Sequence, residues 1–464
     1  MPTTHFPPAA PLQQLADALD AGTTTSRALV ETALERIAAA GGDGAHAFIH
    51  VDADGARRQA DAHDALRRAG VKLSPLAGLP VSIKDLFDVA GERTRAGSRV
   101  LDDIAPATAD APAVARLRRA GAVLIGRTNM SEFAFSGLGL NPWRGTPRSP
   151  WRDSAQDTEG AARVAGGSSS GAAASVAQGM AAAGLGSDTG GSLRIPAAFC
   201  GLTGFKPTAR RTPTAGVFPL STTLDTVGAI APGVACCALL DRVLSTPGCE
   251  PEQRETTRTT LDGVRLAVLS NYVTEGMDQT VAQAWEAALT KLARAGARLV
   301  PLRLPLLDAL PTINRYGFSP IEAYAAHRER LHTQADAYDP RVLARIRHGE
   351  SARAADYLDL LAARAAAIDE ARAALAGFDA FVMPTVPIVP PAIAALEADA
   401  AHFAATNALV LRNPSVVNFL DGCAVSLPCT PQGAAPVGLS VAGLALADAR
   451  VLGIAQAMES VLRG

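Results

Sequence analysis

Two clusters of glycine and hydroxyl residues lie close together in the middle of the chain, at 166–171 (GGSSSG) and 186–194 (GSDTGGSLR). Glycine lets backbone N–H groups converge on one point and lets another molecule approach the backbone closely. Serine supplies a hydroxyl that acts as a nucleophile or passes on a proton. Neither cluster contains a histidine, so the base that a serine nucleophile needs must come from another part of the chain.

Lys84 is the candidate base. It stands among apolar residues in the segment 79–87, where a strand would place its amine in a mostly apolar layer. Desolvation lowers the pKa of a lysine, and a neutral amine is a general base near pH 7. Two plainer interpretations stay open for these residues taken alone. Lys84 could pair with Asp85 or Asp88, and the glycine clusters could form a flexible turn or a phosphate cradle, although no Gly-Lys-Ser/Thr follows them.

Strands and helices alternate around these residues. The sequence predicts helices over 12–40, 52–69, 110–120, 279–295 and 353–376, and strands over 79–85, 122–126, 264–269 and 378–385. This alternation predicts an α/β fold in which helices cover a central sheet. We expect one domain over 1–464, with a helical insertion around 310–376, because nothing between 200 and 440 has the composition of a linker.

Composition narrows the class of protein. The chain has 464 residues, of which 48% are hydrophobic, and a net charge of −2. Without a basic surplus, nucleic acid and anionic membranes are not expected as partners. The first thirty residues lack the pattern of a secretory signal, and no long apolar run follows. The six cysteines show no CxxC spacing. These features predict a cytoplasmic protein with reduced thiols.

Histidines and cysteines outside the two clusters do not predict a further site. His46 and His50 are four residues apart, but no third zinc ligand accompanies them. We interpret both as surface residues, and His327 and His332, in a polar helical region, in the same way. Cys200 follows the second cluster, and we expect a packed thiol there and not a second nucleophile.

Longer stretches around the clusters resemble the amidase signature family. They are 78–85, 126–134, 166–171, 186–197, 199–208 and 378–385. The similarity runs over roughly 12–460, and an ordered set of this length is far more specific than a lone GxSxG. The resemblance implies a single large domain with a central mixed β-sheet covered by helices on both faces. It also implies a hydrolase that needs neither a metal nor an organic cofactor.

The resemblance assigns catalytic roles to Lys84, Ser168 and Ser192. Ser192 matches the nucleophile that forms an acyl-enzyme. Ser168 matches a serine whose preceding peptide bond is cis in the family. Lys84 matches the base that draws a proton from Ser192 through Ser168. A cis bond before a non-proline residue is rare, so we expect one between Gly167 and Ser168 to position that hydroxyl.

The resemblance also assigns residues around the nucleophile. The matching oxyanion hole consists of the backbone N–H groups of Thr189, Gly190, Gly191 and Ser192. Preorganised donors of this kind are worth on the order of 3 kcal/mol each in the transition state. Among supporting residues, we expect Ser169 to orient the lysine amine. Asp188 and Arg194, two charged residues in a glycine-rich turn, are expected to have a structural role.

The substrate pocket is less defined. Met130, Phe133 and Phe135 are candidates for the wall of the acyl pocket, with packing in the core as the commoner fate of such residues. The region of Tyr316 and Phe318 is a candidate for another wall. Two departures from the family pattern lie beside the expected entrance. Val164 and Ala165 precede the first glycine pair where the family usually has a proline. The segment 153–163 is longer and more polar than usual. Both departures predict unusual substrate access.

The expected substrate is a small-molecule amide or carbamate. The resemblance implies that esters and urea derivatives are alternatives, because related members of the family cleave carbamates (urethanes), esters and urea-like bonds with the same triad. A glutaminase subunit of a tRNA-dependent amidotransferase is a further alternative. Its usual Thr-Cys-Ser-rich segment after the lysine is replaced by 85–91 (DLFDVAG), which favours a stand-alone amidase and leaves a homodimer open as its assembly. A catalytically dead scaffold is disfavoured by the intact Lys84, Ser168 and Ser192.

Overall fold

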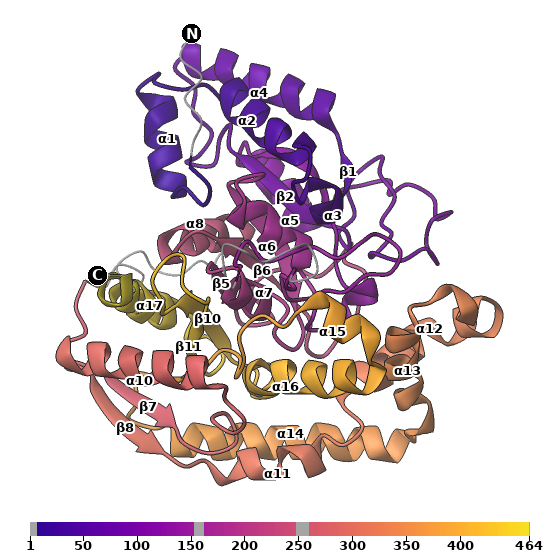
Figure 1. Ribbon diagram of the computed structural model, residues 1–464, viewed down its shortest axis with the longest axis vertical. Helices are drawn as coiled ribbons and strands as arrows, with labels where there is room; N and C mark the ends of the chain where they lie inside the picture. The colour runs from indigo at the N-terminus through magenta and orange to yellow at the C-terminus, as the bar shows by residue number, and fades with distance from the viewer. Residues whose placement is uncertain (1–6, 153–161, 247–258, 464) are drawn as a thin grey trace.

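The computed structural model describes residues 7–152, 162–246 and 259–463. Eleven strands in these ranges form one sheet, in the order β1-β3-β2-β4-β6-β5-β10-β11-β9-β7-β8 (Figure 1). The strands are β1 (Phe48–Val51), β2 (Pro80–Lys84), β3 (Val123–Thr128), β4 (Ala183–Asp188), β5 (Thr203–Lys206), β6 (Thr226–Ala231), β7 (Arg265–Leu269), β8 (Arg298–Leu302), β9 (Ala380–Pro384), β10 (Cys423–Pro428) and β11 (Gly438–Gly443). The sheet contains both parallel and antiparallel pairs, which makes it mixed.

Helices surround this sheet. They are α1 (Leu12–Asp20), α2 (Ser26–Ala38), α3 (Gly44–Ala47), α4 (Ala53–Arg68), α5 (Pro112–Arg119), α6 (Ser170–Ala177), α7 (Arg194–Phe199), α8 (Val234–Leu244), α10 (Gln279–Arg294), α11 (Pro305–Ile313), α12 (Phe318–Gln334), α13 (Pro340–His348), α14 (Ala354–Ala374), α15 (Ile393–Ala398), α16 (Ala400–Phe419) and α17 (Asp448–Arg463). Short 3-10 turns are η1 (Glu132–Ala134), η3 (Ala335–Ala337) and η4 (Gly349–Ser351). Within these ranges every helix is too short or too polar to cross a membrane.

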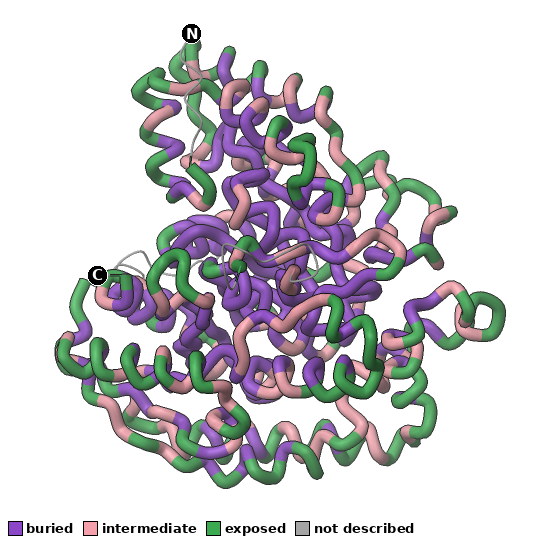
Figure 2. The backbone as a smooth tube through the Cα atoms, viewed as in Figure 1, coloured by how far each residue is buried: buried purple, intermediate pink, exposed green. Residues whose placement is uncertain are grey.

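The centre of the sheet is buried on both faces. Every residue of β2 and of β4 is buried, and the two strands are parallel neighbours, with Ile83 opposite Leu185. Strands without an exposed face are typical of sheets covered on both sides. Helix α6 packs against β2 and β4, and α17 packs against β10 and β11. Figure 2 shows the buried backbone at the centre and the exposed backbone along the outer helices. The predicted α/β fold is therefore confirmed.

Four helices, α11 to α14, occupy the chain between β8 and β9, where the sequence predicts a helical insertion. In Figure 1, α12 and α13 lie at the right edge of the molecule, and α11 and α14 lie along its lower edge. Helix α13 packs against α12, and α14 packs against α11. The section therefore forms a helical wall beside the sheet.

The helical segment predicted over 12–40 is divided in the structure. The structure has two helices there, α1 and α2. Gly22, with a φ of +69°, follows the end of α1, and a left-handed glycine is a frequent helix terminator. The Thr25 hydroxyl then accepts a hydrogen bond from the Ala28 N–H and starts α2 as an N-cap. The threonine-rich residues 23–25 mark the start of the second helix in the sequence.

Candidate active site

Two adjacent parallel strands bring Lys84 and Ser187 together. Lys84 is the last residue of β2, and Ser187 lies one residue before the end of β4. The carboxyl ends of neighbouring parallel strands open on the same edge of a sheet, where ligands commonly bind. The Lys84 Nζ donates to Ser187 Oγ at 2.8 Å and to Ser168 Oγ at 2.7 Å. The amine is thus held by two hydroxyls.

The environment of Lys84 favours its neutral form. The side chain is 0% exposed, and this burial lowers the pKa of Lys84 to about 7 against a weaker opposing attraction by Asp188 and Asp225. Pairing with Asp85 or Asp88 is excluded. Asp85 accepts from Arg127 Nε at 2.7 Å, and Asp88 accepts from the Thr94 hydroxyl. A buried lysine with hydroxyl partners is suited to exchange a proton near neutral pH.

Ser168 lies in the loop that leads into α6. The peptide bond between Gly167 and Ser168 is cis, as predicted. The Ser131 N–H donates to the Ser168 carbonyl at 3.1 Å, and the Gly167 N–H donates to the Gly137 carbonyl at 2.8 Å. These backbone bonds hold the loop against the segment that follows β3, and the Ser168 hydroxyl is fully buried against Lys84.

Ser192 lies in the tight turn between β4 and α7. Gly191 has a φ of +123°, and a Cβ at this position would lie 2.6 Å from Pro414 Cβ. Glycine is therefore required here for both its conformation and its size. Ser192 is 3% exposed and lines a cavity of about 750 Å³. The turn consequently places a serine side chain at the edge of a space large enough for a small molecule.

A buried ion pair fixes this turn. Arg194 donates to the two carboxylate oxygens of Asp188 at 2.9 and 3.0 Å. The same carboxylate accepts from the N–H groups of Gly191 at 2.9 Å and Leu193 at 3.1 Å. Burial works against ionisation of Asp188, but Arg194 holds the pKa of that carboxyl below its ordinary value. Asn418 of α16 also donates to the carboxylate, at 2.9 Å.

Three residues of the turn at the cavity have N–H groups that are not engaged by the protein groups described. Thr189, Gly190 and Ser192 all line the cavity, and among the described residues their N–H groups have no protein acceptor. Gly191 differs, because its N–H donates to Asp188. The structure therefore corrects the predicted set of four free donors to three.

We expect Asp188→Ala to destabilise the protein by about 3–5 kcal/mol, because it leaves Arg194 as a buried charge without a partner. Urea unfolding followed by circular dichroism measures this change. Asp369→Ala is the matched control, since Asp369 belongs to an exposed pair with Arg372, and exposed pairs contribute little. Equal unfolding midpoints for the two variants would contradict the role of the buried pair.

The predicted walls of the cavity are correct in part. Phe135, Tyr316 and Phe318 line it. Met130 and Phe133 do not, and both side chains are buried in the core. Phe133 has a φ of +50° within η1, and its ring packs against His327 at 4.4 Å and against Tyr338. These contacts hold the ring in the core, away from the cavity.

The structure corrects the expectations for Ser169 and His327. The Ser169 hydroxyl donates to the Ser187 carbonyl at 3.3 Å, and Ser187 makes the contact with the lysine amine that was expected of Ser169. His327 is buried and not on the surface, with its Nδ1 2.9 Å from the Tyr338 hydroxyl, and burial lowers the pKa of His327 to about 4.

Three expectations remain, for Cys200, for His46 and for the segment before Val164. Cys200 is a buried free thiol, as expected. His46 lies beside Asp43, and across the described ranges no three His, Cys, Asp or Glu side chains gather in a way that could hold a metal ion. Most of the unusual segment before Val164, residues 153–161, lies outside the described residues.

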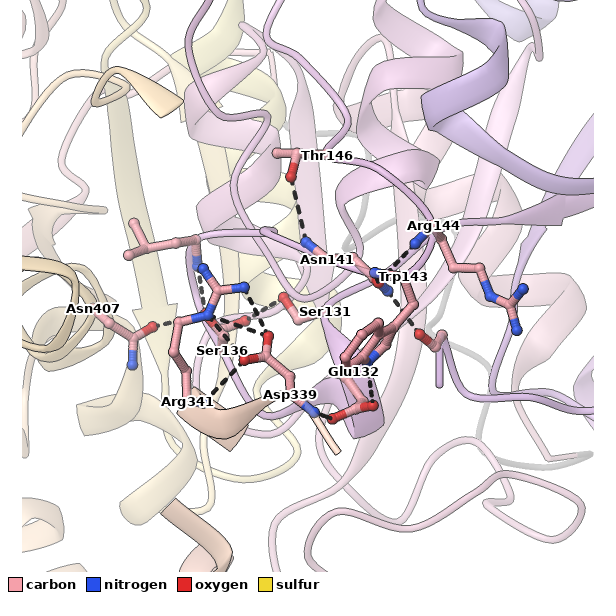
Figure 3. Close-up of polar contacts among 12 residues, drawn as sticks. Ser131, Glu132, Ser136, Asn141, Trp143, Arg144, Thr146, Asp339, Arg341 and Asn407 are labelled. Atoms are coloured by element: carbon pink, nitrogen blue, oxygen red, sulfur yellow. Dashed lines mark hydrogen bonds and ion pairs between the residues drawn. The ribbon is translucent and has the colours of Figure 1, made fainter. Parts of the chain in front are cut away.

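A polar network joins the cavity walls to the core (Figure 3). Glu132, which follows β3, accepts hydrogen bonds from Ser98 at 2.7 Å, from Trp143 at 3.0 Å and from the Asp339 N–H at 2.7 Å. Asp339 caps the N-terminus of α13. Asn407 of α16 accepts from the N–H of Gly137 at 2.8 Å. Helices α13 and α16, which both contribute to the cavity, are thereby fixed to the loops around Ser168.

The sequence alone does not identify several of these residues. Ser187 lies inside the second glycine cluster, yet its contact with Lys84 depends on the pairing of β4 with β2. Asn418 and Asn407 reach the site from more than 200 residues away. No motif marks either of them, and only the packing of α16 against α7 brings this helix to the site.

The chain is similar to known proteins over most of its length. The model of the amidase family matches residues 28–452. A 2-amino-5-chloromuconic acid deaminase from Comamonas testosteroni is 36% identical, over 90% of this chain and 88% of its own. One of the subunits of the glutamyl-tRNA(Gln) amidotransferase from Roseiflexus sp. is 35% identical, over 97% of this chain and 96% of its own.

Solved structures also resemble this chain over nearly its whole length. A crystal structure of an amidase is 32% identical and superimposes with a TM-score of 0.85, covering 98% of this chain and 100% of that chain. The sequence and structural matches extend over nearly the whole chain, beyond the motifs around the two glycine clusters. The protein therefore belongs to the amidase signature family of enzymes, which hydrolyse carbon–nitrogen bonds.

Proposed function

We propose that Ser192 is the nucleophile of a stand-alone amidase, with Ser168 as the proton relay and Lys84 as the base. The observation that carries this proposal is the position of the Lys84 amine. It is fully buried, hydrogen-bonded to Ser168 at 2.7 Å, and lies beside the turn that carries Ser192 into the cavity. A lysine in this setting is able to accept the proton of a serine near pH 7.

The reaction has two halves. Ser192 Oγ attacks the carbonyl carbon while its proton passes to Ser168, and the Ser168 proton passes to neutral Lys84. The tetrahedral intermediate collapses as the carbon–nitrogen bond breaks, and the proton returns through Ser168 to the leaving amine. Water then attacks the acyl-enzyme with the same relay as base and releases the acid and free Ser192.

The negative charge that develops on the carbonyl oxygen needs donors. The N–H groups of Thr189, Gly190 and Ser192 supply them, since in the described structure each is free of a protein acceptor and lies at the cavity. A donor of this kind is worth on the order of 3 kcal/mol in the transition state. Asp188 and Arg194 act as positioning residues, because they hold the turn and engage the fourth N–H, that of Gly191.

The pH dependence of activity follows from Lys84. The base must be neutral, and the pKa of Lys84 lies at about 7. We expect kcat/KM to rise about tenfold per pH unit below this value and to level off above it. Initial rates between about pH 5 and 9 test this. A profile that stays flat from about pH 6 to 8 would contradict Lys84 as the base.

A panel of substrates tests the function itself. It should contain small aliphatic amides, aryl amides, carbamates, an ester and glutamine, with detection of the released amine or alcohol. Labelling with a fluorophosphonate probe and peptide mapping should locate the reactive serine at Ser192. Turnover of no compound together with no labelling of the folded protein would overturn the proposal and favour a scaffold.

Glutaminase activity within an amidotransferase is a second candidate. The 35% identity to a glutamyl-tRNA(Gln) amidotransferase component over 97% of the chain favours it. The segment 85–91, which replaces a Thr-Cys-Ser-rich stretch, favours the stand-alone enzyme. Glutamine hydrolysis by the isolated chain, compared with the other amides, distinguishes the two. We also place the enzyme in the cytoplasm, which the buried free thiols of its described cysteines support.

A further inference from the structure

Asp225 lies beside the turn that carries Ser192. It comes directly before β6, which is antiparallel to β4 and places Thr226 opposite Asp188. Continuing this register by one residue places Asp225 opposite Thr189. The Thr189 hydroxyl donates to Asp225 Oδ1 at 2.5 Å. A residue whose N–H is one of the three unengaged donors of the turn is therefore anchored through its side chain.

The second carboxylate oxygen of Asp225 holds the loop 220–225. Asp225 Oδ2 accepts from the N–H groups of Leu220 at 2.9 Å and of Ser221 at 3.1 Å. Burial raises the pKa of Asp225 to about 6, although these hydrogen bonds oppose the change. The carboxyl is therefore ionised at neutral and higher pH, and an ionised carboxylate only accepts hydrogen bonds. The proton of the Thr189 hydroxyl must then point at Asp225.

The loop 220–225 is fixed in turn to the inserted helices. Glu322 of α12 accepts from the hydroxyls of Ser221 and Thr223 and from the Thr223 N–H at 3.2 Å. The Tyr357 hydroxyl of α14 donates to the same carboxylate at 2.6 Å. These contacts hold the end of the loop against two packed helices. The carboxylate that reaches the turn is consequently supported by groups that are themselves fixed.

Asp188 anchors a different part of the same turn. Its carboxylate accepts from the N–H groups of Gly191 and Leu193, and neither contact reaches Thr189. Among the described contacts, the side chain of Thr189 is held by Asp225. The two aspartates thus fix the two ends of the turn, and the orientation of the Thr189 peptide depends on Asp225.

We propose that Asp225 is a positioning residue for hydrolysis, which holds Thr189 so that its N–H is aligned with the oxyanion. This inference rests on the proposed function of Ser192, and Asp225 itself does not touch the reacting atoms. A donor stabilises the oxyanion only where its geometry matches the transition state, and a displacement of about 1 Å lowers the rate by on the order of 100-fold. Because the charge develops in the transition state, the effect should appear in kcat and not in KM.

Thr189→Val is the main test. Valine keeps the N–H and the branched shape of the side chain and removes the hydroxyl that binds Asp225. On an amide that the enzyme cleaves, we expect kcat to fall about 10- to 100-fold, with KM changed less than about threefold. Thr189→Ser, which retains the hydroxyl, should restore most of the rate.

A fluorophosphonate gives a measure that does not depend on the substrate. Phosphonylation of Ser192 develops charge on the phosphoryl oxygen, which needs the same donors. Its rate constant should fall by the same factor in Thr189→Val and recover in Thr189→Ser. The measurement belongs at about pH 9, because Lys84, with a pKa of about 7, is then neutral in every variant. A change in the charge near Lys84 therefore does not contribute to the result.

A double-mutant cycle shows whether Asp225 acts through Thr189. Asp225→Ala should lower the phosphonylation rate constant at least as much as Thr189→Val does. The variant with both changes should be no slower than Asp225→Ala, because the anchor is already lost. Losses that multiply would overturn the assignment of Asp225 as the anchor of Thr189. Circular dichroism checks the fold of each variant, and the isosteric Thr189→Val decides the question alone if Asp225→Ala does not fold.

Asp278→Ala is the matched control. Asp278 is partly buried, as Asp225 is, and its carboxylate also accepts from two N–H groups, those of Val281 and Val389. It does not belong to the residues that line the Ser192 cavity. The control should therefore retain the wild-type rate constant for phosphonylation.

The outcomes separate this inference from the proposed mechanism. If the wild-type protein is labelled at Ser192 and Thr189→Val is labelled equally fast, the role of Asp225 fails and the nucleophile stands. A loss of amide turnover that lies in KM alone would also overturn the role of Asp225. If the folded wild-type protein is not labelled at Ser192, both the nucleophile and this inference fail.

Discussion

Ser192→Ala is expected to lower kcat by on the order of 10⁴–10⁶-fold, because it removes the group that forms the acyl-enzyme. Its Oγ makes no hydrogen bond with the described protein groups, so the free energy of unfolding should stay close to the wild-type value. Amine release under saturating substrate measures kcat, and urea unfolding measures the free energy of unfolding. The variant should also lose all labelling by the fluorophosphonate.

Ser170→Ala is the matched control for this experiment. Ser170 lies two residues from Ser168 and is equally buried, but its hydroxyl has no hydrogen-bond partner in the described structure. Removal of this hydroxyl should change kcat by no more than a few-fold. If Ser192→Ala retains most of the wild-type activity, or if Ser170→Ala loses as much as Ser192→Ala, the nucleophile has been assigned to the wrong serine.

The local sequence was sufficient to predict the strand that carries Lys84 and the turn that carries Ser192. The apolar run around Lys84 predicts a buried strand, and β2 ends at Lys84 with all five residues buried. The glycine-rich turn before Ser192 also follows from its local residues. The cis bond before Ser168 was expected only from the resemblance to the amidase signature family, and backbone contacts with Ser131 and Gly137 hold its loop.

The features that the sequence did not predict depend on packing between residues that are far apart in the chain. Helix α13, whose residues Arg345 and His348 line the cavity, is held at its start by Glu132, more than 200 residues earlier. Asn418 reaches Asp188 from α16 in the same way. The position of Phe133 also depends on distant residues. An aromatic beside a motif suggests a pocket wall, but the ring of Phe133 packs against His327 and Tyr338.

Lys84→Met is expected to lower kcat on the order of 10³–10⁵-fold, because relay residues act as a unit with their nucleophile. Methionine keeps the length of the side chain but removes the amine that Ser168 and Ser187 contact. Leaving two buried hydroxyls without this partner should cost about 1–3 kcal/mol of stability per group. The protein should stay folded at room temperature, which circular dichroism checks, and the rise of activity through neutral pH should vanish from the residual rate.

The double variant Lys84→Met/Ser192→Ala gives the sharper test of the relay. If Lys84 acts only through Ser192, the double variant should be no slower than Ser192→Ala, because the base has no proton to remove once the nucleophilic hydroxyl is gone. Losses that multiply would mean that Lys84 contributes independently, for example through the charge of its buried amine. Because the amine is 0% exposed and contacts hydroxyls of Ser168 and Ser187, the structure favours the non-additive result.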